Sequence, residues 1–309
     1  MTHPEAGDHG IQHGHDHGSV RGDEVFTALQ RVARADGAEA GRPAPTGEYL
    51  TRHALESFLD RLAHTRHAGT FVLKGGILLA VYGVRRPTKD IDAEAISASV
   101  TPAHLQQVVR DIAGVVTDDG VVFDVDSVSV QQIRGGAEYP GLRVRLSASL
   151  GGHRLLVAWD ISTGDPVIPP PQLIQIPRIL GKPIPMLGYT PETIVAEKGV
   201  TILERGIAST RWRDYLDIVR LSHVHGLNGD LLLQAARAVA RHRQVALGPI
   251  SPVVAGYGAV GQVKWAAWRR KEHLESTSEA DLDDQMAQVA DILDPVFQRG
   301  PATPAPPRA

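Results

Sequence analysis

The sequence predicts an α+β fold, in which a half built on a mixed β-sheet precedes a helical half. Apolar and polar residues alternate within residues 121–150, as they do in strands that bury one face. Prolines are too frequent in residues 163–187 for a helix to form there. After this stretch the apolar residues recur at helical spacing, and Thr190 followed by Pro191 is a typical helix start. The boundary between the two halves therefore falls near Thr190.

Composition limits the possible classes of protein. The 309 residues are 42% hydrophobic and 22% charged, as in soluble globular proteins of one large or two modest domains. No apolar stretch is long enough to cross a membrane, and the polar start MTHPEAGDHG is not a secretory signal, so we expect a cytoplasmic protein without a membrane partner. The absence of cysteine excludes disulfides, thiolate metal sites and cysteine nucleophiles.

The net charge of −3 excludes a chain that is basic overall, but basic residues are clustered. Arg85, Arg86 and Lys89 surround an acidic pair, and residues 269–271 form a basic run beside Trp265 and Trp268. These clusters either bind RNA phosphate or are ordinary solvated charge. The tryptophan spacing is more typical of a core than of an RNA-stacking surface.

Residues 1–45 are expected to be a flexible, His-rich segment. The histidines could bind Zn²⁺ or Ni²⁺ adventitiously, but the first twenty residues lack the apolar content to fold. We expect a short helix at 23–35 and a linker at 37–45.

Residues 46–189 are expected to form the α/β core. Its predicted helices are 49–62, 76–82 and 102–112, the last one behind Thr101 as N-cap. Its predicted strands are 70–73, 90–96, 121–130, 142–150 and 153–161, and a Gly-Gly pair joins the last two as a hairpin.

Residues 190–298 are expected to form a helical domain that completes the site, and residues 299–309 a disordered Pro/Ala tail. The predicted helices begin at Pro191, after Ser209 or Thr210, at Asp230 and at Glu279.

The stretch 71–96, FVLKGGILLAVYGVRRPTKDIDAEAI, carries the strongest functional signal. On a strand, Asp90 and Asp92 point to the same side, and paired carboxylates suit Mg²⁺ or Mn²⁺. The Gly75-Gly76 turn lets the backbone approach a phosphate closely.

A two-metal phosphoryl-transfer site needs a further carboxylate from a neighbouring strand. Asp160 ends the apolar segment LLVAWDI, where an acid has no packing role, and it is the best candidate. Asp124 and Asp126 are a rival pair that we interpret as a solvated strand face.

Two later features have open interpretations. Lys198 lies on a largely apolar helix, and it either reaches solvent or contacts a ligand phosphate. Asp214 and Asp217 share one helix face and are either functional or paired with Arg211 and Arg213 as surface salt bridges.

Taken together, these segments resemble the AbiEii/AbiGii-type nucleotidyltransferase toxins, which include mycobacterial tRNA-modifying enzymes. The matching segments are, in order, FVLKGGILL with RRPTKDID, VAWDISTGDPV, TPETIVAEKG and RWRDYLDI. Each segment alone is weak, but the ordered set is specific. Gly199, where the family commonly has a larger residue, and Arg213, where lysine is commoner, are the departures.

The resemblance implies a core of the DNA-polymerase-β type that transfers NMP from an NTP, in several relatives to the 3′ end of tRNA. It implies that Lys198 contacts nucleotide phosphate and that Asp214 is a catalytic acid or base. Thr88 matches a Ser/Thr position near the γ-phosphate, which in some related toxins an antitoxin phosphorylates. We therefore also expect a cognate antitoxin, an AbiEi-like winged-helix protein.

The expected catalytic residues are Asp90, Asp92, Asp160 and Asp214, of which the first three would bind Mg²⁺ or Mn²⁺. The expected nucleotide-binding residues are Lys74, Gly75, Gly76, Arg86, Thr88 and Lys198. Two alternatives stay open: nucleotidyl or phosphate transfer to a protein, and a catalytically silent member that binds nucleic acid or a partner.

Overall fold

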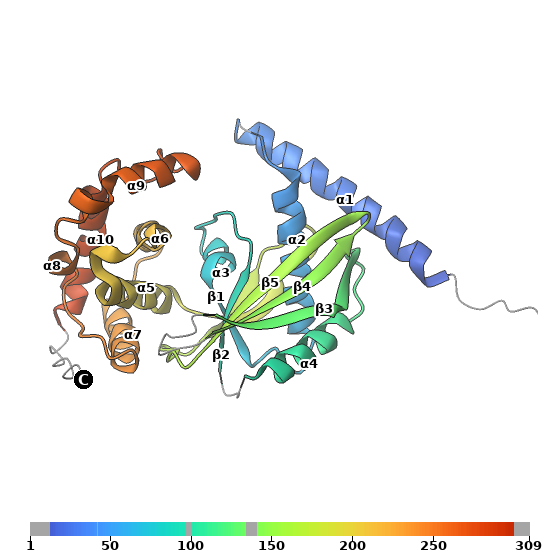
Figure 1. The fold of residues 1–309 in the computed structure, drawn as a ribbon, viewed down its shortest axis with the longest axis horizontal. Coiled ribbons are helices and arrows are strands. Elements are labelled where there is room, and N and C mark those ends of the chain that lie inside the picture. Colours follow the sequence, from blue (N-terminus) through green and yellow to red (C-terminus); the bar gives the residue numbers. More distant parts are fainter. Residues whose placement is uncertain (1–12, 42, 97–99, 134–140, 300–309) are drawn as a thin grey trace, which may run out of the picture.

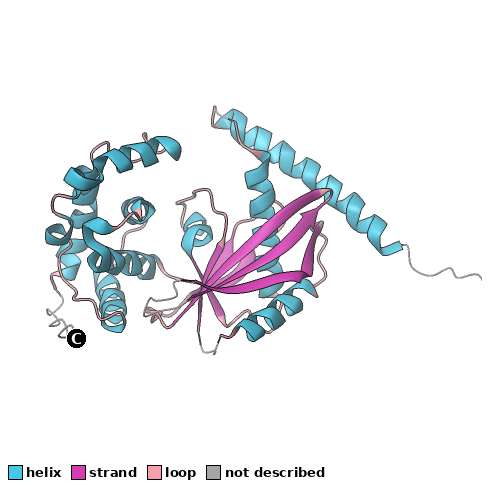
Figure 2. Ribbon diagram, in the orientation of Figure 1, coloured by secondary structure: helices cyan, strands magenta, loops and turns pink. Residues whose placement is uncertain are grey.

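The computed structural model describes residues 13–41, 43–96, 100–133 and 141–299. A strongly twisted sheet with its covering helices forms one part, and a cluster of helices from the second half of the chain forms the other (Figures 1 and 2). The predicted order of a mixed sheet followed by a helical half is confirmed.

The sheet has seven strands in the order β3-β4-β5-β2-β1-β7-β6. Strands β2 and β5 are parallel, as are β1 and β7, and the other neighbours are antiparallel, so the sheet is mixed. The strands are β1 (Phe71–Lys74), β2 (Ile91–Ala95), β3 (Val121–Ile133), β4 (Gly141–Leu150), β5 (His153–Thr163), β6 (Gln172–Ile176) and β7 (Ile184–Gly188).

Strands β6 and β7 lie in the proline-rich stretch, where only short extended pieces were expected. Pro185 is inside β7, opposite Gln175 of β6. It is tolerated because β7 pairs with its other neighbour, β1, only through Gly188 and Leu73, so Pro185 has no ladder partner on that side.

The helices beside the sheet are α1 (His13–Glu39), α2 (Thr46–Ala63), α3 (Gly75–Val81) and α4 (Pro102–Ala113). The helical part contains α5 (Pro191–Arg205), α6 (Trp212–Val224), α7 (Gly229–His242), α8 (Ser251–Val254), α9 (Tyr257–Lys271) and α10 (Leu282–Phe297). None of the helices in the described ranges combines the length and the apolarity needed to cross a membrane.

Helix α1 is longer than the short helix predicted at 23–35, and the assignment of 1–45 as a flexible segment stays a prediction. Val25, Leu29 and Ala33 recur every four residues and are buried. This face packs against α2 and β4 (Figure 1), and Phe26 stacks on His153 of β5 at 4.1 Å between ring centroids. His3, His9 and the tail 300–309 lie outside the described residues.

The helical half differs from the prediction at the start of α6 and in two helices that were not predicted, the four-residue helix α8 and helix α9. Arg211, rather than Ser209 or Thr210, is the N-cap of α6, although the Ser209 hydroxyl accepts a hydrogen bond from the Arg211 amide. Helix α9 was not predicted, because Gly, Ala and charged residues interrupt its apolar spacing. Trp265 is fully buried within it, and its ring meets Trp212 edge-to-face, so the core interpretation of this tryptophan is correct.

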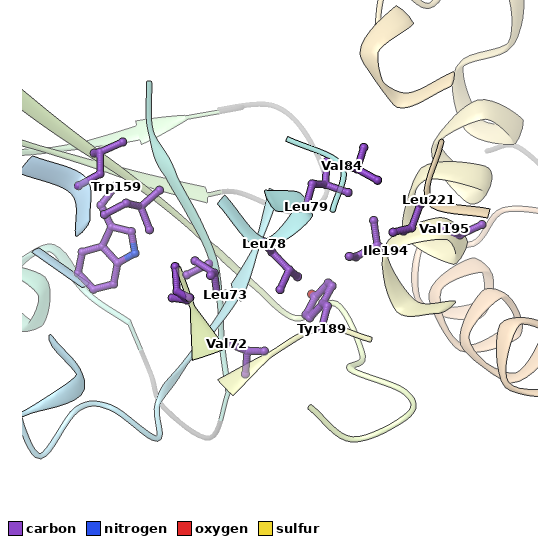
Figure 3. Packing of buried hydrophobic residues seen from close by; sticks show 14 of the residues in the cluster. Val72, Leu73, Leu78, Leu79, Val84, Trp159, Tyr189, Ile194, Val195 and Leu221 are labelled. Atoms are coloured by element: carbon purple, nitrogen blue, oxygen red, sulfur yellow. The ribbon is translucent and has the colours of Figure 1, made fainter. Parts of the chain in front are cut away.

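An apolar seam joins the two parts of the molecule (Figure 3). Leu78, Leu79 and Tyr189 on the sheet side lie toward Ile194 of α5 and Leu221 of α6, and all five are buried. The last strand ends at Gly188 and α5 begins at Pro191, in agreement with the boundary near Thr190. The assignment of 46–189 and 190–298 as two domains stays a prediction.

Gly199 of α5, a departure from the family pattern, is explained by packing. A Cβ at this position would lie 2.8 Å from Cζ of Phe297 and 3.0 Å from Cδ1 of Leu293. Helix α10 therefore fills the space that a larger side chain at position 199 would need.

We predict that α1 contributes to the stability of the fold. Leu29→Ala removes a fully buried side chain and is expected to lower the free energy of unfolding by about 2–4 kcal/mol in urea. The same change at the exposed Leu173 should cost less than about 0.5 kcal/mol. Equal small effects at both positions would show that α1 does not belong to the core.

Candidate active site

Three carboxylates meet on one face of the sheet because of strand register. Trp159 of β5 packs against Phe58 of α2, so the next residue, Asp160, points to the opposite face. Strand β2 is parallel to β5 with Asp92 directly opposite Asp160. Asp90 precedes β2 and is two residues from Asp92, so it shares that side. The structure thus brings together the three acids that the sequence analysis chose.

The Gly75-Gly76 turn is packed directly against this acidic site. Gly75 has a φ of +70°, and a Cβ on it would lie 1.9 Å from Oδ2 of Asp92. A Cβ on Gly76 would lie 2.4 Å from Oγ1 of Thr88. Both positions therefore require glycine, and the start of α3 lies against Asp92 and Thr88.

Arg143 of β4 provides positive charge at the same place. Its Nε donates to Oδ1 of Asp160 at 2.5 Å, and Nη2 donates to Oδ2 of the same carboxylate. Nη2 also lies 3.8 Å from Oδ2 of Asp90. One guanidinium is therefore shared by two of the three acids.

The acids influence one another's ionisation. Burial raises the pKa of Asp92 to about 6, and the neighbouring Asp90 acts in the same direction. Burial also raises the pKa of Asp90, with a further contribution from Asp160, while Arg143 and Arg86 oppose the rise. Such a site gains from an added cation, because like charges at short range otherwise favour protonation.

The donor set is compatible with a divalent cation. Carboxylate oxygens are the ligands that Mg²⁺ and Mn²⁺ prefer, and Gly75 lets the Asp92 carboxylate occupy the space that a Cβ would need. Among the described residues, no group of three or more His, Asp or Glu is already arranged to hold a metal ion. Asp90, Asp92 and Asp160 are the residues that would bind it.

A second charged cluster lies on α5 and α6. The ammonium of Lys198 donates to Oδ1 of Asp214 and, at 3.0 Å, to Oδ2 of Asp217. Arg211 donates to the other oxygen of Asp214 at 2.5 Å, and Arg86 lies 3.4 Å from Oδ1 of Asp217. Lys198 is therefore not a solvent-reaching lysine, and these are not surface salt bridges.

Asp214 is held in its ionised form. Burial by itself would raise the pKa of this carboxyl, but Lys198 and Arg211 outweigh burial and lower its pKa to about 2. Arg213, the other expected partner of the pair, instead contacts Glu272 at 2.5 Å.

The comparisons with known proteins identify the family. The model of the family described as "Nucleotidyl transferase AbiEii toxin, Type IV TA system" matches residues 57–305. The chain belongs to this family. The resemblance drawn from the motifs is therefore confirmed, and it extends beyond residue 221, where the recognised motifs end.

The solved structures that this chain resembles include two proteins of Helicobacter pylori. One is JHP933, with 13% identity, 81% of this chain and 91% of that chain covered, and a TM-score of 0.46. The other is provisionally described as a nucleotidyltransferase, with 14% identity, 79% and 92% coverage, and a TM-score of 0.45. The comparison with curated proteins gave no match.

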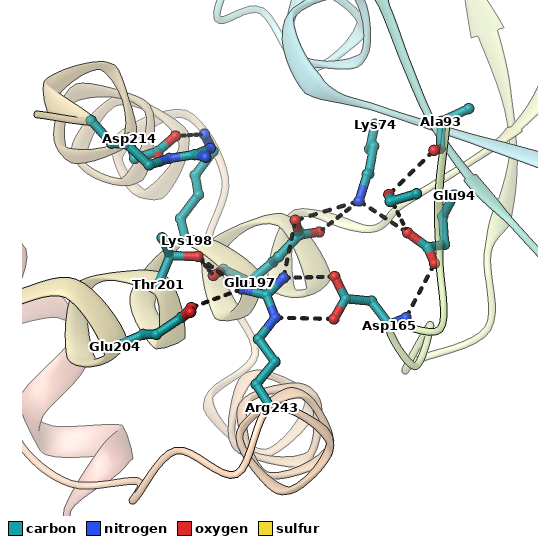
Figure 4. A network of polar contacts seen from close by, with 12 residues as sticks. Lys74, Ala93, Glu94, Asp165, Glu197, Lys198, Thr201, Glu204, Asp214 and Arg243 are labelled. Atoms are coloured by element: carbon teal, nitrogen blue, oxygen red, sulfur yellow. Dashed lines mark hydrogen bonds and ion pairs between the residues drawn. The ribbon is translucent and has the colours of Figure 1, made fainter. Parts of the chain in front are cut away.

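Sequence reasoning missed a third network in this AbiEii chain, which links the sheet to α5 and α7 (Figure 4). The Lys74 ammonium donates to Glu94 of β2 at 3.0 Å and to Glu197 of α5 at 3.4 Å. Arg243, the C-cap of α7, makes a two-pronged contact with Asp165, at 3.0 and 2.6 Å, and lies 3.5 Å from Glu197.

Only part of this network had a signal in the sequence. Glu94 continues the alternation of Asp90 and Asp92 along one strand, so its direction could have been predicted. It is fully buried, accepts from the Ser162 hydroxyl at 2.6 Å and accepts from the Asp165 amide at 3.1 Å. Arg243 comes from a helix far along the chain, and its local sequence contains no sign of this role.

The rival acidic pair is separate from the site. Asp124 and Asp126 are exposed on β3, and β4 and β5 lie between that strand and β2. Asp124 accepts a hydrogen bond from the amide of Asp126 at 3.2 Å, where the β3–β4 register shifts. The structure therefore agrees with the solvated-face interpretation.

A pocket adjoins the α6 side of this AbiEii site. Arg86 and Asp217 line it on one side, and Trp268 and Glu272 of the α9 region line it on the other. Its mixture of arginine and tryptophan places positive charge and an aromatic surface beside Lys198 and its partners.

The pKa of Asp92 predicts a pH-dependent stability in buffer without divalent cations. The folded-state pKa of Asp92 is raised to about 6. The stability that its protonated carboxyl contributes is therefore fully present below pH ~4 and is lost as the pH rises through 6. Asp92→Asn should therefore gain stability relative to the wild type by up to about 3 kcal/mol between pH 4 and pH 8.

Urea unfolding at several pH values measures this difference, and Asp124→Asn on the exposed strand is the matched control. The raised pKa of Asp92 would be contradicted if the difference in unfolding free energy between the wild type and Asp92→Asn did not change with pH.

Proposed function

We propose that this member of the AbiEii family transfers NMP from an NTP to an acceptor hydroxyl, with the tRNA 3′ end as the preferred acceptor. The observation that supports this most directly is the convergence of Asp90, Asp92 and Asp160 beside a glycine turn. This arrangement offers carboxylates for a divalent cation and backbone for phosphates at one point.

The proposed reaction is an in-line displacement at the α-phosphorus. A bond forms between the acceptor oxygen and the α-phosphorus while the bond to the pyrophosphate oxygen breaks, and the hydroxyl proton passes to Asp160. A divalent cation bound by Asp90, Asp92 and Asp160 would neutralise charge on the triphosphate and favour loss of that proton.

The second cluster is proposed to hold the phosphates. Lys198 would contact a nucleotide phosphate, with Arg86 beside it. Both Asp214 oxygens are engaged and its pKa is about 2, so it is better suited to orient Lys198 than to act as an acid or base. This favours a positioning role over the catalytic role that the resemblance implied.

The upstream residues receive different roles. Gly75 and Gly76 are proposed to line the triphosphate path. Lys74 could join them only by leaving Glu94 and Glu197, so we regard its present contacts as structural.

Thr88 is half-buried, and its hydroxyl donates to the Arg86 carbonyl at 3.2 Å beside Gly76. A phosphate there would place negative charge where the NTP is proposed to bind, which supports Thr88 as the regulatory site.

Membership of a type IV toxin–antitoxin family implies a cognate antitoxin. We propose an AbiEi-like winged-helix protein as that partner and a cytoplasmic location, where NTPs and tRNA are available.

We predict that Asp90→Ala abolishes NTP-dependent labelling of RNA by [α-³²P]NTP while the protein stays folded. The reason is the loss of one of the carboxylates proposed to bind the cation. Asp124→Ala, which removes an exposed acid from β3, should label RNA like the wild type. Undiminished labelling by Asp90→Ala would exclude the assigned cation site.

The acceptor can be identified with total cell extract and two labels. Transfer to tRNA predicts label in the RNA fraction from the α-phosphate and none from the γ-phosphate, because pyrophosphate leaves. Label in protein would favour the alternative acceptor, and γ-label retained in a product would indicate phosphate transfer. Absence of Mg²⁺-dependent NTP binding by calorimetry would favour the catalytically silent alternative.

A further inference from the structure

Arg143 occupies the part of the acidic site where a cation is needed. Its guanidinium contacts both oxygens of Asp160 and lies 3.8 Å from Asp90. The Asp90 side chain is 39% exposed, so a hydrated ion can reach this carboxylate from solvent. The site is therefore accessible, but its charge is partly neutralised by the protein itself.

Strand register, rather than chance surface pairing, places Arg143 there. Arg143 is directly opposite Asp160 in the antiparallel pairing of β4 with β5, and Asp160 is directly opposite Asp92 in the parallel pairing with β2. Arg145 shares the strand and its face, yet within the described ranges its guanidinium donates to Gln131, at 3.2 Å, and not to the acids. Two arginines two residues apart thus have different surroundings.

A guanidinium and a small divalent cation compete for the same carboxylate, because both are attracted by its negative charge and repel each other at short range. Mg²⁺ and Mn²⁺ bind carboxylate oxygen at about 2.0–2.2 Å, which requires a free lone pair directed at the ion. A two-pronged contact with arginine uses both oxygens of a carboxylate and is among the stronger charge-assisted hydrogen bonds. Binding of the ion through Asp160 therefore competes with this contact and weakens it.

We propose that Arg143 is the resident counter-ion of the acidic site and that a divalent cation binds by displacing it from Asp160. This inference rests on the proposed function, since it assigns a role to Arg143 at the same site. Arg143 then acts as a positioning residue. Before the divalent cation binds, its guanidinium pairs with Asp160 in place of another cation. After it is displaced, its positive charge is available to an anionic ligand.

Because Arg143 and the divalent cation compete, substituting Arg143 is expected to change the affinity for the cation in the opposite direction from substituting a residue that binds it. Removing Arg143 should strengthen the binding of a divalent cation rather than weaken it. We expect Arg143→Gln to lower the Kd for Mn²⁺ by about tenfold or more, because a charge-assisted contact no longer has to be broken. Arg145→Gln should keep the wild-type Kd within about twofold, because an exposed charge is screened by solvent and salt.

The experiment is a titration of the full-length protein with Mn²⁺ alone, without nucleotide, followed by the electron paramagnetic resonance signal of the free ion. Thermal melts without metal show whether each variant is folded. Arg143→Lys, which keeps the charge but loses the two-pronged contact, should bind Mn²⁺ with an intermediate Kd and replaces Arg143→Gln if the latter does not fold.

The outcomes separate this inference from the proposed function. Equal binding by the wild type and both Arg143 variants would overturn the counter-ion role and leave the cation site intact. Weaker binding by the variants would also overturn it, because Arg143 would then support the site. Absence of binding in all proteins would remove the cation site itself, and with it both proposals. Tighter binding by Arg143→Gln, with unchanged binding by Arg145→Gln, supports the inference.

Discussion

The parallel pairing of β2 with β5 is the constraint on which the site depends. It places Asp92 opposite Asp160, although 67 residues separate them in the chain. A shift of the register by one residue would turn one of these acids toward Phe58 and the core. The apolar face of the sheet, where the rings of Trp159 in β5 and Phe71 in β1 lie 4.6 Å apart between centroids, opposes such a shift. Core packing thus determines where the carboxylates meet.

Several acids on one face repel one another, and basic side chains from other strands and helices offset this repulsion. Arg143 neutralises Asp160, Lys74 neutralises Glu94, and Arg243 neutralises Asp165. Pairs of this kind contribute little net stability when complete, but loss of one partner leaves a buried charge without compensation. These contacts are therefore better understood as fixing the arrangement of the site than as sources of stability.

Helix α5 transmits this arrangement between the two parts of the molecule. Its adjacent residues Glu197 and Lys198 point to different partners: Glu197 contacts Lys74 on the sheet, and Lys198 contacts Asp214 on α6 (Figure 4). The apolar seam around Ile194 packs on the same helix. A change in the position of α5 would therefore alter the Lys74 network and the Lys198 cluster together.

The sequence alone determined the elements with strong local signals: the alternating strands, the helix capped by Thr190, and the direction shared by Asp90 and Asp92. It also identified Asp160, because an acid at the end of an apolar strand has no packing role. Only the tertiary structure decided what these groups contact. Helix α1 and strand β7 needed their neighbours to form, and the partners of Lys74, Arg143 and Arg243 lie on other strands and helices. Contacts between distant elements depend on register and packing, which no local pattern of residues contains.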